Sequence, residues 1–363
     1  MRGIRKAALL IAASALVLSG CGGSDDEPEA KDGGSGASED VCKTADGDGP
    51  KIGVAYDVGG RGDQSFNDSA YAGITTAVED LDATCIEAEA GQEENDTVRE
   101  ERLRTLAEQG FNPIIAVGFI YSPAAAKVAE EMPDTNFVVV DGFASSIAEL
   151  PNLSDLIFAE QEGSFLVGAA AAMKSEAKHV GFVGGTRGEL IQKFEAGYVA
   201  GVKAVDPSIK VEVQYLTEDP NDGEAGFENP TGAKTAAEGQ LDKGVDVIFH
   251  AAGKSGLGVF QAVTAAGEGM WAIGVDSDQY LSAESEQQAH ILTSMVKRID
   301  VAVSEYVAAF DEGSAPAGFT NYDLSVDGVG YATSGGFVDD VKADLDGYAE
   351  KIKSGEIKVP TAP

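Results

Sequence analysis

The sequence predicts an α/β protein built from two doubly wound lobes. Short apolar runs of strand length alternate with segments of helical periodicity along most of the chain that follows Gly49. Such alternation is typical of parallel sheets with right-handed crossovers. About ten strands over about 300 residues exceed one hydrophobic core of ordinary size, which favours two lobes over one.

The ten strand candidates are short, mostly apolar runs that turn-forming residues bound. They are Ile52–Tyr56, Thr84–Ala88, Pro113–Val117, Asn136–Val140, Leu153–Phe158, His179–Val183, Lys210–Leu216, Val245–His250, Met270–Val275 and His290–Met295. The segments with helical spacing are Thr97–Gln109, Gly163–Lys174, Leu190–Val205, Gly232–Asp242 and Gly256–Ala266. A further helix opens after the first strand and a glycine-rich loop, where Ser65 or Asn67 can cap its first turn.

The first 49 residues indicate a leader and a tether rather than part of the fold. Residues 1–20 combine three basic residues with the apolar stretch Ala7–Leu18, which is typical of a secretory signal peptide. Residues 18–21, Leu-Ser-Gly-Cys, match the bacterial lipobox, in which the cysteine, here Cys21, is lipidated; an ordinary cleaved signal is the alternative. Residues 21–49 are acidic and rich in Gly and Ser, and they predict a disordered tether.

The cysteine count and the net charge bear on the disulfide pairing and on the ligands that the protein can bind. With Cys21 assigned to a lipid, Cys42 and Cys85 remain. In an exported protein such a pair suggests one disulfide, and two separate buried thiols are the alternative. The formal net charge is −35, and it is −38 without the three basic residues of 1–20. This charge repels nucleic acid and argues against phosphate-rich ligands unless the pocket is locally basic.

Three carboxylates follow apolar strands that are far apart in the sequence. Asp57 follows Gly-Val-Ala-Tyr, Asp141 follows Phe-Val-Val-Val, and Asp276 follows Ala-Ile-Gly-Val. Aspartate favours turns, so any one of them alone also fits a turn former. Ligands of open parallel sheets bind beyond the carboxyl ends of the strands, so two facing lobes would bring all three carboxylates into one cleft.

Two phenylalanines have positions that suggest the same cleft. Phe66 and Asn67 lie just after the first strand and its loop, where a ligand would sit. Phe227 lies in the polar loop Thr217–Pro230, where hydrophobic burial is not the obvious reason for it. Phe227 either packs locally to anchor the loop or stacks its ring on a flat ligand.

The sequence does not match the motifs for a phosphate-binding loop, a metal site or a catalytic serine. Gly253-Lys254-Ser255 lacks the upstream glycine of a phosphate loop, because Ile248 occupies that position. Gly253 more plausibly lets backbone amides approach a ligand. The chain has three histidines, none with a cysteine or second histidine at metal-ligand spacing, and no Gly-x-Ser-x-Gly elbow. We therefore expect no enzyme, no metal and no cofactor, although paired carboxylates leave hydrolysis open.

A series of motifs, taken in order, resembles the basic membrane protein (BMP) family, lipoproteins that are substrate-binding proteins of ABC importers and include purine nucleoside receptors. The motifs are Asp57–Asn67, Val140–Gly142, Glu162–Gly168, Val183–Gly185, Phe194–Tyr198, Phe227–Gly232, Ala251–Gly258, Trp271–Gln279, Leu292–Asp300 and Ile352–Pro360. The resemblance covers Lys51–Pro360. One departure is the loop before Phe227, which is several residues longer than usual.

The resemblance implies a type I periplasmic-binding-protein fold, in which two lobes joined by three hinge crossovers close on a ligand. The crossovers are expected near Gly142–Phe158, Thr293–Met295 and Phe319–Leu324. The first lobe is then 50–142 with 295–319, and the second is 158–293 with 324–363.

The resemblance also implies the binding residues: two phenylalanines sandwich a purine, and acidic residues and a lysine bond the base and the ribose. The matching positions are Asp57, Phe66, Asn67, Asp141, Phe227, Gly253, Asp276 and Lys297. Carboxylates accept hydrogen bonds from a ribose diol or from purine N–H groups. A cleft of this negative character suits neutral nucleosides and disfavours nucleotides.

The expected function is that of a lipid-anchored protein on the extracytoplasmic face of the cell membrane. It would bind a purine nucleoside and deliver it to an ABC permease. The alternatives are the same fold with a sugar or another small polar metabolite, a sensor that presents its ligand to a membrane receptor, and an exported nucleoside hydrolase. The absence of an Asp-x-Asp-x-x-x-Asp cluster counts against the hydrolase.

Overall fold

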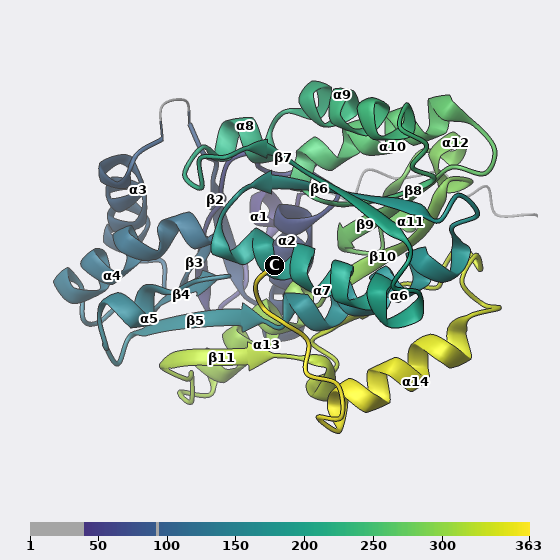
Figure 1. The fold of residues 1–363 in the computed structure, drawn as a ribbon. Coiled ribbons are helices and arrows are strands. Elements are labelled where there is room, and N and C mark those ends of the chain that lie inside the picture. The colour runs from purple at the N-terminus through teal and green to yellow at the C-terminus, as the bar shows by residue number, and fades with distance from the viewer. Residues whose placement is uncertain (1–39, 92–93) are drawn as a thin grey trace, which may run out of the picture. The chain divides into compact units, whose positions relative to one another are not determined.

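A computed structural model describes residues 40–91 and 94–363. The predicted signal peptide, Cys21 and most of the predicted tether lie outside these residues. The described chain forms two six-stranded sheets, with orders β11-β5-β4-β3-β1-β2 and β12-β10-β9-β8-β6-β7 (Figure 1). Every strand pair is parallel except β10 and β12, which are antiparallel.

Each of the ten predicted strands overlaps an observed strand. The first sheet contains β1 (Lys51–Ala55), β2 (Thr84–Ala88), β3 (Ile114–Val117), β4 (Phe137–Val140), β5 (Leu153–Phe158) and β11 (Gly318–Tyr322). The second contains β6 (His179–Thr186), β7 (Lys210–Thr217), β8 (Val247–Ala251), β9 (Trp271–Asp276), β10 (Ile291–Lys297) and β12 (Val329–Tyr331). Strands β3, β4 and β8 are buried along their whole length, as parallel strands covered on both faces should be.

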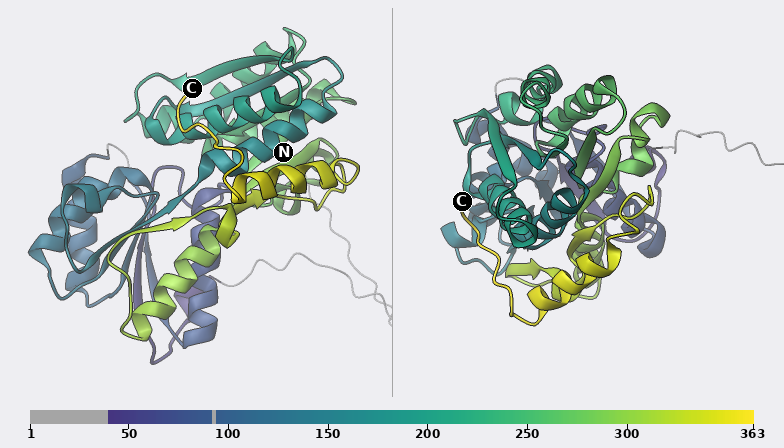
Figure 2. Two further views of the ribbon diagram at one scale, coloured as in Figure 1. Left: turned by 60° about the horizontal axis from the view of Figure 1, so that its bottom comes forward. Right: turned by 45° about the vertical axis from the view of Figure 1, so that its right-hand side comes forward.

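Helices surround each sheet, so that each sheet with its helices forms one lobe (Figure 2). They are α1 (Val41–Thr44), α2 (Phe66–Leu81), α3 (Asp96–Glu108), α4 (Ser122–Glu131), α5 (Ala144–Ile147), α6 (Glu160–Lys174), α7 (Glu189–Val205), α8 (Gly223–Phe227), α9 (Pro230–Leu241), α10 (Leu257–Ala266), α11 (Gln279–Ser282), α12 (Ser285–Gln288), α13 (Ile299–Asp311) and α14 (Lys342–Lys353). Short 3-10 turns are η1 (Phe119–Tyr121), η2 (Gly253–Gly256) and η3 (Leu324–Val326). None of the helices in the described ranges is long and apolar enough to cross a bilayer.

Glycines bring α6 and α7 into backbone contact. A Cβ atom at Gly168 would lie 2.2 Å from the carbonyl oxygen of Tyr198, and one at Gly201 would lie 2.0 Å from that of Phe165. Neither position therefore accepts a side chain without moving a helix. The close packing fixes α6 and α7 against each other, and the amino-terminal turns of both helices carry residues of the site described below.

The chain passes between the two sheets after β5, after β10 and after β11. Strand β5 pairs with β4 and β11 in the first sheet, so the chain leaves that sheet after Phe158. Strand β10 continues in the second sheet to Lys297, two residues beyond the expected end of the second crossover. Helix α13 then packs against α2. The expected lobe boundaries remain a proposal, because strand pairing locates the strands alone.

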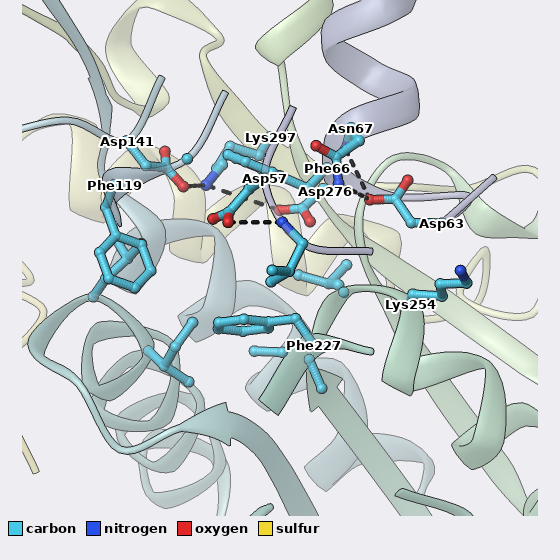
Figure 3. A pocket seen from close by; sticks show the side chains of 18 of the residues that line it. Asp57, Asp63, Phe66, Asn67, Phe119, Asp141, Phe227, Lys254, Asp276 and Lys297 are labelled. Carbon is cyan, nitrogen blue, oxygen red and sulfur yellow. Dashed lines mark hydrogen bonds and ion pairs between the residues drawn. The ribbon is translucent and has the colours of Figure 1, made fainter. Parts of the chain in front are cut away.

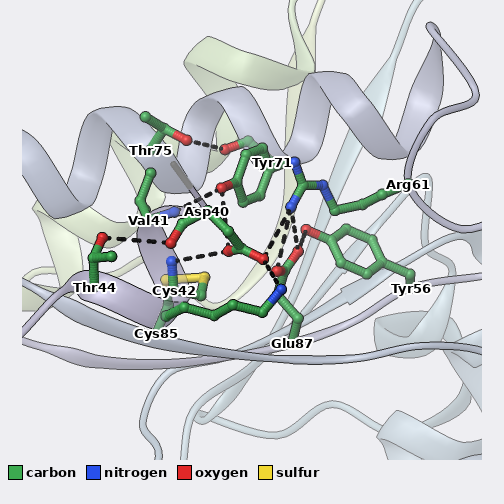
Figure 4. Close-up of a disulfide and its surroundings, with 11 residues drawn as sticks. Asp40, Val41, Cys42, Thr44, Tyr56, Arg61, Tyr71, Thr75, Cys85 and Glu87 are labelled. Carbon is green, nitrogen blue, oxygen red and sulfur yellow. Dashed lines mark hydrogen bonds and ion pairs between the residues drawn. A yellow bond between two sulfur atoms is a disulfide. The ribbon is translucent and has the colours of Figure 1, made fainter. Parts of the chain in front are cut away.

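The predicted disorder of residues 21–49 is wrong for its last ten residues, 40–49. Helix α1 lies there, and Cys42 is bonded to Cys85 at the start of β2 (Figure 4). The carboxylate of Asp40 caps the helix by accepting from the Cys42 amide, and Val41 N donates to the Tyr71 hydroxyl at 2.9 Å. A disulfide and a cap hold this segment against the first lobe although its composition is that of a tether.

Candidate ligand-binding site

All eight predicted binding residues line one cavity, at the carboxyl ends of strands from both sheets (Figure 3). It encloses about 590 Å³ of empty space, open solvent at its mouth included. The other residues that line it are Val58, Asp63, Gly118, Phe119, Leu190, Ile191, Phe194, Ala251, Ala252, Lys254 and Val275.

Lys297, the last residue of β10, is the cation at the centre of this cavity. Its side chain is 1% exposed, and its Nζ lies 2.5 Å from Asp141 Oδ2, 3.7 Å from Glu160 Oε1 and 3.9 Å from Asp276 Oδ1. Burial lowers the pKa of Lys297, but the three carboxylates outweigh it and hold the pKa above its usual range. The ammonium group therefore stays charged and partly neutralises three buried acids.

Asp141 and Asp276 occupy equivalent places in the two sheets. Asp141 follows β4 and Asp276 ends β9, and each of these strands is third in its sheet from the β11 or β12 edge. Both aspartates have left-handed backbone angles, with φ of 59° and 64°. Residues other than glycine adopt this conformation uncommonly, and such strain clusters at ligand sites. The three strand-end carboxylates predicted to converge, including Asp57, do share one cavity.

Ser65 connects the loop after β1 to the second sheet. Its hydroxyl donates to Asp276 Oδ2 at 2.6 Å. Nearby, the Ser277 hydroxyl donates to the Gln64 carbonyl at 2.8 Å. Burial raises the pKa of Asp276, and Lys297 and the Ser65 hydroxyl oppose that rise. These bonds join the two lobes at the edge of the cavity.

Ser65 is the N-cap residue of α2, as one of the two predicted alternatives had it, but its side chain makes no capping bond. The first amides of the helix donate instead to Asp63. Its carboxylate accepts from the amides of Ser65, Asn67 and Asp68 at 2.8–3.1 Å, and from the Asn67 side-chain amide at 3.1 Å. Burial raises the pKa of Asp63 to about 6, against the lowering effect of these donors. Within the described chain Asn67 Oδ1 has no hydrogen-bond partner, so Asn67 can accept from a ligand.

Asp57 is half-buried and held by its own loop. Its Oδ1 accepts from the Val58 amide at 2.7 Å, and burial raises its pKa to about 6. A Cβ atom at Gly118 would lie 2.4 Å from Asp57 Oδ2, and Gly118 also has φ of 115°. Only glycine at 118 permits this approach of the backbone after β3 to the carboxylate.

Tyr56, the residue before Asp57, is fixed at both ends. Its hydroxyl donates to Glu87 Oε1 at 2.8 Å, and its carbonyl accepts from the Tyr121 hydroxyl at 2.9 Å. Arg102 Nη1 in turn donates to the Tyr121 hydroxyl at 2.6 Å. Tyr56 has no exposed surface. The backbone that carries Asp57 is therefore anchored by side chains from β2, η1 and α3.

The two predicted rings reach the cavity from different lobes. The Phe66 ring, at the start of α2, has Lys297 Nζ 5.1 Å from its centroid. Phe227 ends α8 rather than lying in a loop, and Figure 3 shows its ring across the cavity from the row of carboxylates. A Cβ atom at Gly185 would lie 2.4 Å from the Phe227 ring, so Gly185 makes room for it. Gly253, with φ of 50°, lies against the same side chain.

Several residues of the site are absent from the sequence prediction. Glu160, with no exposed surface, accepts from Lys193 Nζ at 3.1 Å, and burial raises its pKa. It follows β5 by two residues, so the rule that found the other strand-end carboxylates could have found it. Phe194 adds a third ring, with Lys297 Nζ 5.6 Å from its centroid. Its helical spacing is also that of ordinary core, so the signal that could have found it is the family motif Phe194–Tyr198.

Comparison with known proteins agrees with this geometry. Residues 50–362 match the Bmp family, described as ABC transporter substrate-binding protein PnrA-like. A CD4+ T-cell-stimulating antigen of Listeria innocua is 32% identical over 98% of this chain and 97% of its own length. The ABC transporter nucleoside-binding protein BmpA of Lactococcus lactis is 29% identical over 96% of each chain. A crystal structure of ABC transporter system solute-binding proteins from Aeropyrum pernix K1 covers 86% of this chain and 93% of its own, with 27% identity and a TM-score of 0.75.

These matches confirm the type I periplasmic-binding-protein fold and the predicted family. The family comprises extracytoplasmic solute-binding proteins rather than enzymes, which implies a small-molecule ligand and a permease partner. The chain belongs to the Bmp family of PnrA-like ABC transporter substrate-binding proteins.

Proposed function

We propose that this protein binds a purine nucleoside between its two lobes and delivers it to an ABC permease. The observation that carries the proposal is the combination of aromatic rings, carboxylates and one buried lysine around a single cavity. The nucleoside-binding relative of Lactococcus lactis supports the same ligand class.

The rings would hold the base. Phe66 and Phe227 enter the cavity from different lobes, so lobe closure would bring them to the two faces of a planar ligand. Stacking of a base on an aromatic side chain is worth roughly 1–3 kcal/mol and tolerates different bases. Hydrogen bonds from purine N–H groups would go to Asp57 and to the Asn67 Oδ1 atom, which accepts no bond within the described chain.

The row of charged residues would hold the sugar. Asp141 and Asp276 can accept from ribose hydroxyls, and Lys297 can donate to a ribose oxygen. Three buried carboxylates around one ammonium leave this end of the cavity negative. A phosphate group would be repelled there, so the ligand is a nucleoside and not a nucleotide.

The anchor would be a lipid on Cys21, followed by an acidic tether. This part of the proposal rests on the lipobox in the sequence. In a Cys21→Ser variant the protein should leave the membrane fraction, whereas the wild type should stay with it. Equal amounts of both in the membrane fraction would contradict the anchor.

Isothermal titration calorimetry with guanosine, inosine and adenosine tests the ligand directly. We expect binding of at least one of them, with the corresponding 5′-monophosphates at least tenfold weaker. No heat from any of the three nucleosides at 0.1 mM would contradict the nucleoside assignment. Recovery of the nucleoside intact after long incubation would separate binding from hydrolysis.

A further inference from the structure

A second cavity, which we call the outer chamber, adjoins the binding cavity. It encloses about 1140 Å³ of empty space including its mouth. It lies between the two lobes, since its lining includes Ile157 of β5, Thr186 of β6 and Pro220 after β7. The two cavities share Phe119, Asp141, Leu190 and Ile191. The outer chamber is therefore continuous with the proposed nucleoside site at the end where Asp141 lies.

Three buried oxygen atoms of residues that line the outer chamber have no hydrogen-bond partner in 40–91 or 94–363. They are Asp141 Oδ1, Glu160 Oε1 and Thr186 Oγ1. The three residues are 8%, 0% and 0% exposed. Buried polar atoms are satisfied in the great majority of cases. Glu160 Oε1 lies 3.7 Å from the Lys297 ammonium group, so we rely on Asp141 Oδ1 and Thr186 Oγ1. These two oxygens favour a group with hydrogen-bond donors at the chamber.

The charges around the chamber narrow the chemistry of that group. Asp141 and Glu160 line it together with Asp96 and Glu189, against the one ammonium group of Lys193. Lys193 Nζ is already bonded to Glu160 Oε2. An anionic group is therefore disfavoured. A hydroxyl both donates to carboxylates and accepts from an ammonium group, so it fits this mixed lining without a charge of its own.

We propose that the outer chamber is a subsite for a neutral, hydroxyl-bearing extension on the sugar end of the nucleoside. This rests on the proposed function, because it places the ribose at Asp141 and Lys297. Figure 3 shows Asp141 and Phe119 at one end of the binding cavity, with Asp63 and Lys254 at the other. A ribose at Asp141 would lie beside the outer chamber, because Asp141 lines both cavities, and the proposal places its 5′ carbon on that side. The substrate class thus includes nucleosides that are extended at this carbon.

The first test compares a purine nucleoside with its 5′-deoxy-5′-(2-hydroxyethylthio) derivative by calorimetry on the full chain. The parent is whichever of guanosine, inosine and adenosine binds most tightly. We expect the derivative to bind within about tenfold of the parent, because the chamber has room and acceptors for it. Binding of the derivative more than about 100-fold weaker than the parent would overturn the subsite. No binding of any parent would overturn the proposed function and the subsite with it.

Variants of the chamber separate a subsite from a merely open cleft. A Cβ atom at Gly188 would lie 3.5 Å from Pro220 and 3.7 Å from Thr186 Oγ1, and φ there is −102°. Gly188→Phe should therefore fill the chamber without backbone strain, whereas Gly188→Ala is its matched control. We expect Gly188→Phe to weaken the derivative at least about 30-fold and the parent less than about threefold. Equal weakening of both ligands by Gly188→Phe would overturn the proposal.

Thr186→Val gives a second, subtler variant, because it keeps the shape of the side chain and removes its hydroxyl. We expect it to weaken the derivative about fivefold and to leave the parent within about twofold. An unchanged affinity for the derivative in both Thr186→Val and Gly188→Phe would show that the extension does not enter the chamber.

Discussion

Lys297 Nζ lies 2.5 Å from Asp141 Oδ2, although the two residues are 156 positions apart and belong to different sheets. Lys297 ends β10 of the second sheet, and Asp141 follows β4 of the first. Both side chains are almost fully buried, and both line the proposed nucleoside cavity. One ion pair thus joins the two lobes at the point where the ligand is proposed to bind.

Removal of the Lys297 charge should weaken both the fold and the site. Lys297→Met leaves the carboxylates of Asp141, Glu160 and Asp276 without their cation. Loss of one partner of a buried pair typically costs about 3–5 kcal/mol, so we expect a loss of that size in the free energy of unfolding. Urea unfolding measures it. Lys342→Met removes a half-exposed ion pair with Asp346 and should cost less than about 1 kcal/mol. Equal losses in the two variants would contradict the central role of Lys297.

Truncation of either ring should weaken nucleoside binding. We expect Phe66→Ala and Phe227→Ala each to lose roughly 1–3 kcal/mol of binding free energy, because each removes one stacking face. Calorimetry with the preferred nucleoside measures the loss. Phe319→Ala is the control, since Phe319 is 49% exposed on β11 and does not line the cavity. If both cavity variants bind as tightly as this control, the rings do not stack on the ligand. That result would favour a sugar over a nucleoside as the ligand.

The half-buried carboxyl group of Asp57 should make the ligand-free fold less stable as the pH rises. Its pKa is raised from 3.8 to about 6, mainly by burial. Between about pH 4 and pH 6 the folded protein therefore binds more protons at Asp57 than the unfolded chain does. The free energy of unfolding should fall through this window, by up to about 3 kcal/mol from this group.

Urea unfolding of the wild type and of Asp57→Asn at pH 4, 5, 6 and 7 measures this contribution. The variant should lose less stability than the wild type over the window, because asparagine does not titrate. Asp134→Asn, at an exposed position, should keep the wild-type dependence. Identical pH profiles for all three proteins would contradict the raised pKa.

The hydroxyl of Tyr121 should position Asp57 for binding. Tyr121→Phe removes the bond to the Tyr56 carbonyl and the acceptor for Arg102. We expect nucleoside affinity to fall about fivefold and stability to fall by about 1 kcal/mol. In the described chain the Tyr280 hydroxyl makes no hydrogen bond, so Tyr280→Phe is a matched control that should change neither quantity. A stability loss without any change in affinity would assign Tyr121 to the fold alone.

The disulfide should stabilise the first lobe. Cys42 and Cys85 are 43 positions apart, and removal of a disulfide from a small secreted domain typically costs about 2–5 kcal/mol. We expect the Cys42→Ser, Cys85→Ser double variant to unfold at lower urea concentration than the wild type. Addition of a reducing agent should lower the midpoint of the wild type and leave that of the double variant unchanged. A response of the double variant to the reducing agent would contradict this explanation.

The fold was largely predictable because its parallel strands are buried and apolar. The two strands that were missed lie at sheet edges: β11 has the sequence Gly-Phe-Thr-Asn-Tyr, of which the last residue alone is buried, and β12 has three residues. Neither gives the continuous apolar run that identifies a buried strand. The order in 40–49 was also missed, since a disulfide and a cap, and not composition, hold that segment.

Residues of the candidate site were predictable in two cases: where a carboxylate follows an apolar strand, and where the residue lies in a motif of the family. Asp141 and Asp276 illustrate the first case, and Lys297 the second. Asp63 was missed because a loop aspartate near a helix start has many possible partners, and Ser65 is an equally good cap by residue type. The choice between the two side chains as acceptor for the first amides of α2 depends on Asp276, more than 200 positions away, which takes the Ser65 hydroxyl as a donor.

A crystal structure of the protein with its preferred purine nucleoside tests the central claim most directly. The account predicts the base between the Phe66 and Phe227 rings, with the ribose within hydrogen-bond distance of Asp141 and Lys297. A nucleoside bound outside this cavity, or one whose base contacts neither ring, would contradict it.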